Sequence, residues 1–184
     1  MTMIFDGSNG IIFPDSTPQA SAAIPGIRGQ VFTSSGTFTV PAGITAVKVS
    51  LCGGGGNSNG TTGGGGGGVA IKYITGLTAG GTVTVTIGAA GGTTSFGAYC
   101  SATGGGSPTN GAGSGGDLNF QGNSYSSGTG GGGAGVGNPQ GFPMTGMLGG
   151  AGGSTNGPSA ATGYGNGGST ASTSGTPGVC IVEW

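Results

Sequence analysis

The residues VCIVEW, positions 179–184, give the clearest indication of how this chain folds. Val179, Ile181 and Val182 favour a β-strand, and the run follows a long glycine-rich stretch. The other strand patterns lie far upstream, within residues 30–88. A last strand that returns to pair with these early strands would close a sandwich-like base. The stretch between them is therefore expected to be a loop system held at both ends.

Upstream of this stretch, hydrophobic residues alternate with polar ones in the pattern of half-buried strands. Residues 44–52 place Val47, Val49 and Leu51 on one face, and runs 69–74 and 82–87 alternate in the same way. Residues 30–33 and 37–40 flank Ser34-Ser35-Gly36, which suits a hairpin. The sequence thus predicts an all-β fold with a small β-sandwich-like base closed by the C-terminal strand.

Glycine makes up 52 of the 184 residues of the chain and is concentrated outside these strand patterns. So much glycine cannot be ordered by side-chain burial, because glycine has none to bury and loses most conformational freedom on folding. Glycine runs can adopt the polyproline II geometry of about three residues per turn, which directs every backbone N–H and C=O outward. Without a strict collagen repeat, the glycine-rich block inserted into the base is expected to form packed polyglycine II helices.

Charge is sparse: Arg28, Lys48 and Lys72 are set against Asp6, Asp15, Asp117 and Glu183, and histidine is absent. Three scattered cations cannot form a phosphate-binding surface, so no nucleic-acid partner is expected. The scattered carboxylates offer no paired acids for glycosidase chemistry, unless assembly of several chains brings them together. We expect no enzyme activity, cofactor or metal.

Residues 113–119, GSGGDLN, are similar to a single calcium-binding β-roll repeat. Such repeats work in tandem arrays. We expect Asp117 and Asn119 instead to hydrogen-bond the backbone where the chain turns between glycine helices.

Cys52, Cys100 and Cys180 are odd in number and lie in or beside apolar runs. Buried thiols are favoured over a disulfide, although one pair remains possible. The N-terminus lacks the pattern of a signal peptide, and no apolar run approaches transmembrane length, so no membrane insertion is expected. Synthesis in the cytoplasm is expected, with release by another route.

Two regions are expected along the chain. Residues 1–29 form an N-terminal attachment or oligomerisation segment, whose candidate contact residues are Ile4, Phe5, Ile11, Ile12 and Phe13. Residues 30–184 form a glycine-rich domain, divided into a β scaffold, 30–88 and 179–184, and a display block, 89–178.

Four segments of the chain, in this order, resemble the glycine-rich domain of bacteriophage tail-fibre and tail-tip proteins. They are VFTSSGTFTVPAGITAVKVSLCGGGG, VAIKYITGLTAGGTVTVTIGAAGGTTSFG, GSGGDLNFQG and GVCIVEW, which together span about residues 30–184. The N-terminal GSNGIIFPDSTPQASAA also resembles attachment segments of tail fibres. Cys52 and Cys180 depart from the pattern, which usually has an aromatic or aliphatic residue and a valine there.

The resemblance implies a virion protein of the phage tail, often a homotrimer, that binds a bacterial surface receptor, either a carbohydrate or an outer-membrane protein. The N-terminal segment would bind other tail proteins. The receptor-contact candidates are the large residues stranded among the glycines, which could instead fold back to cover the edges of the glycine bundle: Tyr125, Phe142, Met144, Met147, Leu148 and Tyr164. Two alternatives stay open, a structural tail adaptor without receptor contact and an ice-binding protein.

Overall fold

The computed structural model describes residues 4–6, 10–12, 18–19, 28–60, 62–123, 163–168 and 174–184, the first three ranges by their backbone alone. Every described element is a β-strand, and every strand pairing is antiparallel. The all-β prediction is therefore confirmed. The described residues include no helix that could span a membrane.

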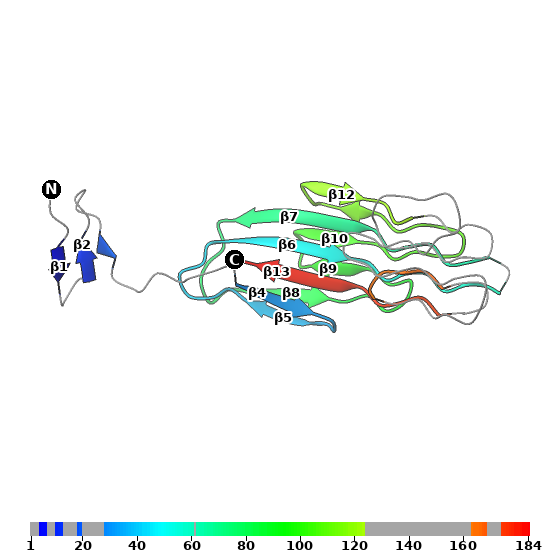
Figure 1. Cartoon of the computed structure of the whole chain (residues 1–184), viewed down its shortest axis with the longest axis horizontal. Helices are drawn as coiled ribbons and strands as arrows, with labels where there is room; N and C mark the ends of the chain where they lie inside the picture. The colour runs from blue at the N-terminus through cyan, green and yellow to red at the C-terminus, as the bar shows by residue number, and fades with distance from the viewer. Residues whose placement is uncertain are drawn as a thin grey trace.

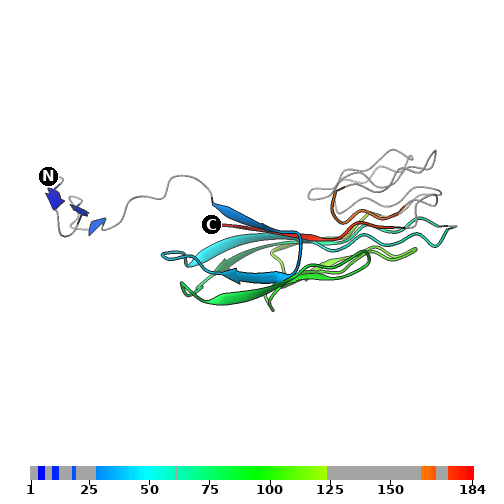
Figure 2. The same ribbon diagram turned by 90° about the horizontal axis from the view of Figure 1, so that it is seen from below.

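Two five-stranded sheets form the sandwich (Figures 1 and 2). The first sheet has the order β12 (Leu118–Phe120), β7 (Val69–Thr75), β6 (Ala46–Cys52), β13 (Val179–Glu183), β4 (Gly29–Phe32). The second has the order β11 (Gly113–Ser114), β10 (Cys100–Ala102), β9 (Thr94–Phe96), β8 (Thr82–Thr86), β5 (Gly36–Thr39). A separate three-stranded sheet is formed near the N-terminus by β1 (Ile4–Asp6), β2 (Gly10–Ile12) and β3 (Pro18–Gln19).

The C-terminal strand lies inside the first sheet, as expected. β13 pairs with β6 on one side and β4 on the other, so Cys180 lies opposite both Leu51 and Phe32. Reciprocal backbone hydrogen bonds between Arg28 and Trp184, 3.0 and 2.8 Å, extend the ladder beyond the strands. Strands far apart in the sequence are thus hydrogen-bonded to one another in one sheet.

The core between the two sheets comes from the alternating residues. β8 shows the pattern clearly, since Val83 and Val85 are buried and the threonines on either side of each are exposed. Phe38 and Phe96, both fully buried, pack side by side on the inner face of the second sheet, with ring centroids 5.7 Å apart. All three cysteines are buried thiols without a disulfide, as the sequence favoured.

The hairpin predicted around Ser34-Ser35-Gly36 is wrong. β4 and β5 lie in different sheets, where β4 pairs with β13 and β5 with β8. The short connection carries the chain from one layer to the other, so that Phe32 and Phe38 enter the same core from opposite sheets. Burial of two aromatic side chains outweighs a local hairpin.

The strands β9 to β12 lie within residues 89–178, the range expected to be a display block. Each has only two or three residues, too few for a visible alternation. The β scaffold therefore continues to Phe120.

Candidate functional site

Glycine runs lie together at one end of the sandwich, where they continue its strands (Figures 1 and 2). The run 53–56 follows β6 directly, and the run 64–68 leads directly into β7. We call the following runs the glycine lattice: 53–56, 64–68, 88–92, 103–106, 165–168 and 175–178. Two of them lie in the part of the chain that the sequence assigned to the scaffold, so the lattice draws on more than one inserted block.

Successive amides of the run 53–56 hydrogen-bond to three different neighbouring runs. The bonds are Gly53 N–H to Gly68 O, 3.0 Å, Gly54 to Gly92, 2.9 Å, Gly55 to Thr176, 2.9 Å, and Gly56 to Gly65, 2.8 Å. The donors Gly53 and Gly56, three residues apart, therefore bind the same run. This repeat is the threefold geometry of a polyglycine II helix.

The run 64–68 shows the same repeat with other neighbours. Gly64 and Gly67 donate to the run 165–168, at Gly168 O and Gly165 O, both 2.8 Å. Amides one position further on donate to the run 103–106: Gly65 to Gly106 O, 2.7 Å, and Gly68 to Thr103 O, 3.0 Å. The remaining amide, Gly66, binds Asn123 O at 3.1 Å. The run is thus surrounded by bonded neighbours, which makes the lattice three-dimensional rather than a flat sheet.

The lattice requires glycine because its runs touch through their backbones. A β-carbon on Gly55 would overlap the carbonyl of Asn166, and one on Gly64 would overlap the carbonyl of Gly56. Neither backbone could move aside without breaking its own hydrogen bonds. Polyglycine packing is therefore held by the backbone, with the side chains excluded from it.

Asn166 is an exception to this exclusion, because its large polar side chain lies inside the lattice. Its side chain is fully buried, and its backbone N–H donates to Thr176 Oγ1 at 2.8 Å while its carbonyl accepts from Thr176 N–H at 2.9 Å. Sequence reasoning missed this residue, since an asparagine among glycines is usually placed in an exposed turn.

The tip of the lattice carries a network of polar side chains from two loops. Thr62 Oγ1 and Ser107 Oγ lie 2.7 Å apart and join the loops. Within the first loop, Asn59 Oδ1 accepts from Thr62 N–H at 2.7 Å, and Ser58 Oγ donates to Thr62 O at 2.9 Å. Asn57 Oδ1 accepts from Gly175 N–H at 2.9 Å and ties this loop to the run 175–178. The loops are thereby held to the lattice.

The receptor-contact candidates fall mostly outside the described residues. Tyr164 alone is described: it is partly buried and packs against the cluster of Cys52, Val69 and Val179. For Tyr164, this contact matches the alternative in which the side chain folds back. The other five candidates lie beyond the described ranges, namely Tyr125, Phe142, Met144, Met147 and Leu148.

Of the attachment candidates, Ile4 and Phe5 lie in β1, and Ile11 and Ile12 in β2. Phe5 pairs with Ile11 across the two strands. Phe13 lies outside the described residues.

Asp117 and Asn119 hydrogen-bond the backbone at a turn, as expected. The Asn119 side chain accepts from Gly116 N–H at 3.0 Å and donates to Gly116 O at 2.8 Å, while Asp117 Oδ2 accepts from Tyr73 N–H at 2.7 Å. The turn joins β11 to β12 rather than two glycine helices.

Both carboxylates with described side chains lie beside lysines. Glu183 Oε2 is 2.8 Å from Lys48 Nζ, and Asp117 Oδ1 is 3.8 Å from Lys72 Nζ. The hydrogen bond to Glu183 raises the pKa of Lys48 above its ordinary value. Within the described part of the chain, no three His, Cys, Asp or Glu side chains gather into a group that could hold a metal.

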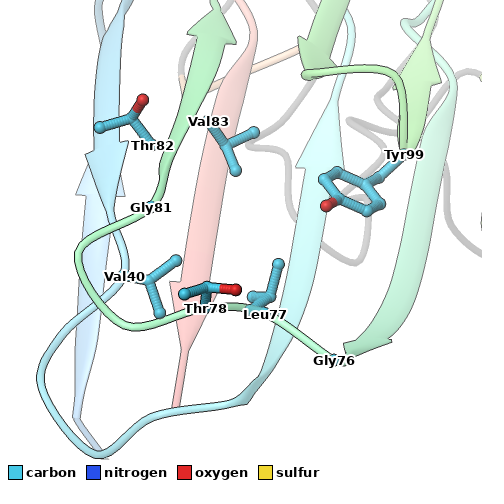
Figure 3. Close-up of a pocket in the computed structure, with 8 residues that line it drawn as sticks. All are labelled: Val40, Gly76, Leu77, Thr78, Gly81, Thr82, Val83 and Tyr99. Atoms are coloured by element: carbon cyan, nitrogen blue, oxygen red, sulfur yellow. The ribbon is translucent and has the colours of Figure 1, made fainter.

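A shallow hollow of about 200 Å³ lies at the end of the sandwich opposite the lattice (Figure 3). Val40, Leu77 and Val83 form its apolar wall, and the ring of Tyr99 lines it from one side (Figure 3). Its other lining residues are Gly76, Thr78, Gly81 and Thr82, so no charged side chain lines it.

No protein-family model matches the chain, and no curated protein is significantly similar to it.

Proposed function

We propose that this chain is a bacteriophage tail-fibre or tail-tip adhesin that binds a bacterial surface receptor through loops on the glycine lattice. The observation that carries the proposal is the threefold hydrogen bonding of the runs 53–56 and 64–68. A lattice bonded through its backbone stays rigid whatever side chains its loops carry. A rigid scaffold with variable loops is the usual architecture of a recognition surface.

The loops at the lattice tip would make the contacts. Their described side chains are amides and hydroxyls, such as Asn59 and Ser107, which can hydrogen-bond sugars or peptide backbones. The large residues of the segment 142–148 would add apolar anchors. Several weak contacts on one particle would give avidity. The N-terminal segment would attach the domain to other tail proteins, and neither a cofactor nor catalysis is needed.

A binding assay tests this proposal. The purified full chain is labelled and offered to a panel of Gram-negative and Gram-positive strains, and binding is read by flow cytometry. We expect saturable binding to a restricted set of strains, with competition by unlabelled chain. The double variant Phe142→Ala and Leu148→Ala should lose binding with unchanged circular dichroism, whereas the control Thr84→Ala and Ser101→Ala, on a sheet face away from the lattice, should bind normally.

The second candidate is a structural tail adaptor without receptor contact. It is favoured by exposed apolar side chains on the outer face of the first sheet, such as Val31 and Leu118, which suit a contact with another protein subunit. The structural candidate would be favoured over the adhesin if the chain bound none of the strains and antibody could not reach it in intact particles.

A further inference from the structure

The two outer faces of the sandwich differ sharply in chemistry. On the sheet β11-β10-β9-β8-β5, the outward side chains are hydroxyl-bearing and form a polar face: Thr37, Thr39, Thr82, Thr84, Thr86, Ser95, Ser101 and Ser114. Such a face is well hydrated and needs no partner. The opposite outer face has a different composition.

The outer face of the sheet β12-β7-β6-β13-β4 is apolar. The strand register aligns one row across the whole sheet: Leu118, Ile71, Ser50, Ile181 and Val31. The two ends of this row are well exposed, Leu118 at 54% and Val31 at 59%. Tyr73, 66% exposed, and Phe120, 38% exposed, project from the same face on either side of the row. We call this surface, residues 31, 71, 73, 118, 120 and 181, the apolar face.

Part of the same sheet surface already serves as a packing surface. At the lattice end, Tyr164 lies against Cys52, Val69 and Val179, whose side chains share this side of the sheet. The apolar face continues this buried patch toward the other end of the sandwich, where the described residues leave it exposed. Contiguous exposed apolar surface on a soluble protein marks an interaction site.

The charges on this side of the sheet are compatible with the same face of a second copy of the chain. Lys48 and Glu183 lie side by side on β6 and β13, paired at 2.8 Å, and each side chain keeps roughly a third or more of its surface exposed, 40% and 33%. One cation and one anion give no net charge, so neither a polyanion nor a polycation is favoured. A twofold interface joins identical patches, so an axis that passes beside this pair would bring Lys48 of one copy to Glu183 of the other.

We propose that the apolar face binds a second copy of this chain, so that two sandwiches stack with the sheet β12-β7-β6-β13-β4 of each in contact. Stacked sheets pack with their side chains interleaved at about 10 Å separation. The formal net charge of −1 adds little repulsion between copies. The inference is independent of receptor binding, since it concerns another surface of the molecule.

Sedimentation of the purified full chain over a range of concentrations tests the proposal. We expect a species with the mass of two copies. The double variant Val31→Asp and Leu118→Asp would place two carboxylates in the interface and raise the dissociation constant by about a hundredfold or more. The matched control Thr37→Asp and Ser114→Asp places the same charges at exposed positions on the two edge strands of the polar face, β5 and β11, and should dimerise normally. Thermal melts should show that both variants stay folded.

Charge exchange tests the pairing itself. Lys48→Glu or Glu183→Lys alone should weaken the dimer, because like charges would then meet both within each chain and across the interface. The double exchange Lys48→Glu with Glu183→Lys should restore it. A chain that stays monomeric at all concentrations would overturn the proposal, as would any assembly that the Val31→Asp and Leu118→Asp variant leaves intact.

Discussion

Gly67 illustrates how single residues limit the lattice. A β-carbon there would overlap the carbonyl oxygen of Gly53, and both backbones are held by hydrogen bonds, Gly67 N–H to Gly165 O and Gly53 N–H to Gly68 O. Relief of the clash would cost bonds in two runs at once. Whether a glycine position tolerates a larger residue thus depends on whether it faces fixed backbone atoms or a side chain.

Gly67→Ala should lower the free energy of unfolding by about 2–3 kcal/mol or more, as overpacking against fixed atoms does. Gly36→Ala is the matched control, since a β-carbon there would make only ordinary contacts, 3.6 Å from the Phe32 ring, and alanine favours folding over glycine by about 0.5–1 kcal/mol. Urea unfolding measures both. Equal stability of the two variants would contradict the backbone-packed lattice.

The buried thiols make stability depend on alkaline pH. Burial raises the pKa of Cys100 from 9.0 to about 11 and that of Cys180 from 9.0 to about 12. Their stabilising contribution is complete below pH 9 and is lost as the pH rises from 9 toward 11–12, because the unfolded chain then releases protons that the folded chain retains.

Cys180→Val should therefore reduce the loss of unfolding free energy between pH 8 and pH 10. Urea titrations at both pH values measure this loss for the variant and the unmodified chain, in which the other titrating groups are the same. If the two proteins lost stability equally, the thiol would not be the cause.

At the scale of elements, β13 explains why two sheet segments from opposite ends of the sequence form one structure. Its inward residues Cys180 and Val182 are fully buried in the core, while Ile181 faces outward and is partly exposed. The strand also supplies pairing partners to both β6 and β4. Loss of inward packing on β13 should therefore weaken the whole sheet.

Val182→Ala should destabilise the domain by about 2 kcal/mol, since it leaves a cavity in a fully packed core. Ile181→Ala, one position along the same strand, removes more atoms but from the partly exposed outer face, and should cost less, about 1 kcal/mol. Thermal melts of both variants, at a concentration where the chain is monomeric, provide the measurement. The reverse order would mean that the outer face, rather than the core, holds β13.

Sequence reasoning succeeded where a pattern extended over several residues. β6, β7 and β8 were predicted from alternation, and the pairing of β13 with early strands followed from its isolation. It failed where the signal was short: β9 to β12 have two or three residues each, and the partner of β4 depends on tertiary packing. The burial of Asn166 within the lattice likewise depends on neighbours distant in sequence.

At the scale of the whole molecule, two regions held together by different interactions, the sandwich and the glycine lattice, join end to end. The sandwich is held by side chains such as Phe38 and Phe96, whereas the lattice is held by amide hydrogen bonds between runs. Both parts share the same chain segments, since β6 passes directly into the run 53–56. They should therefore open together when the domain unfolds.

Hydrogen exchange measured by mass spectrometry tests this. Peptides covering the runs 53–56 and 64–68 should exchange slowly, with protection of about a hundredfold or more, approaching that of β6. Peptides from the exposed turn around Gly43 should exchange fast and serve as the internal reference. Fast exchange of the runs would mean that their backbone bonds do not hold the lattice in solution.

The threefold repeat of the runs also restricts how such a gene can change in length. Residues three apart bind the same neighbour, as Gly64 and Gly67 do. An insertion of one or two residues would therefore turn every later amide of that run toward a different neighbouring run. Insertion of three residues, nine nucleotides, would keep all bonds in phase and carry a loop about 9 Å farther from the sandwich. Descendants of this chain should therefore gain and lose reach in whole triplets.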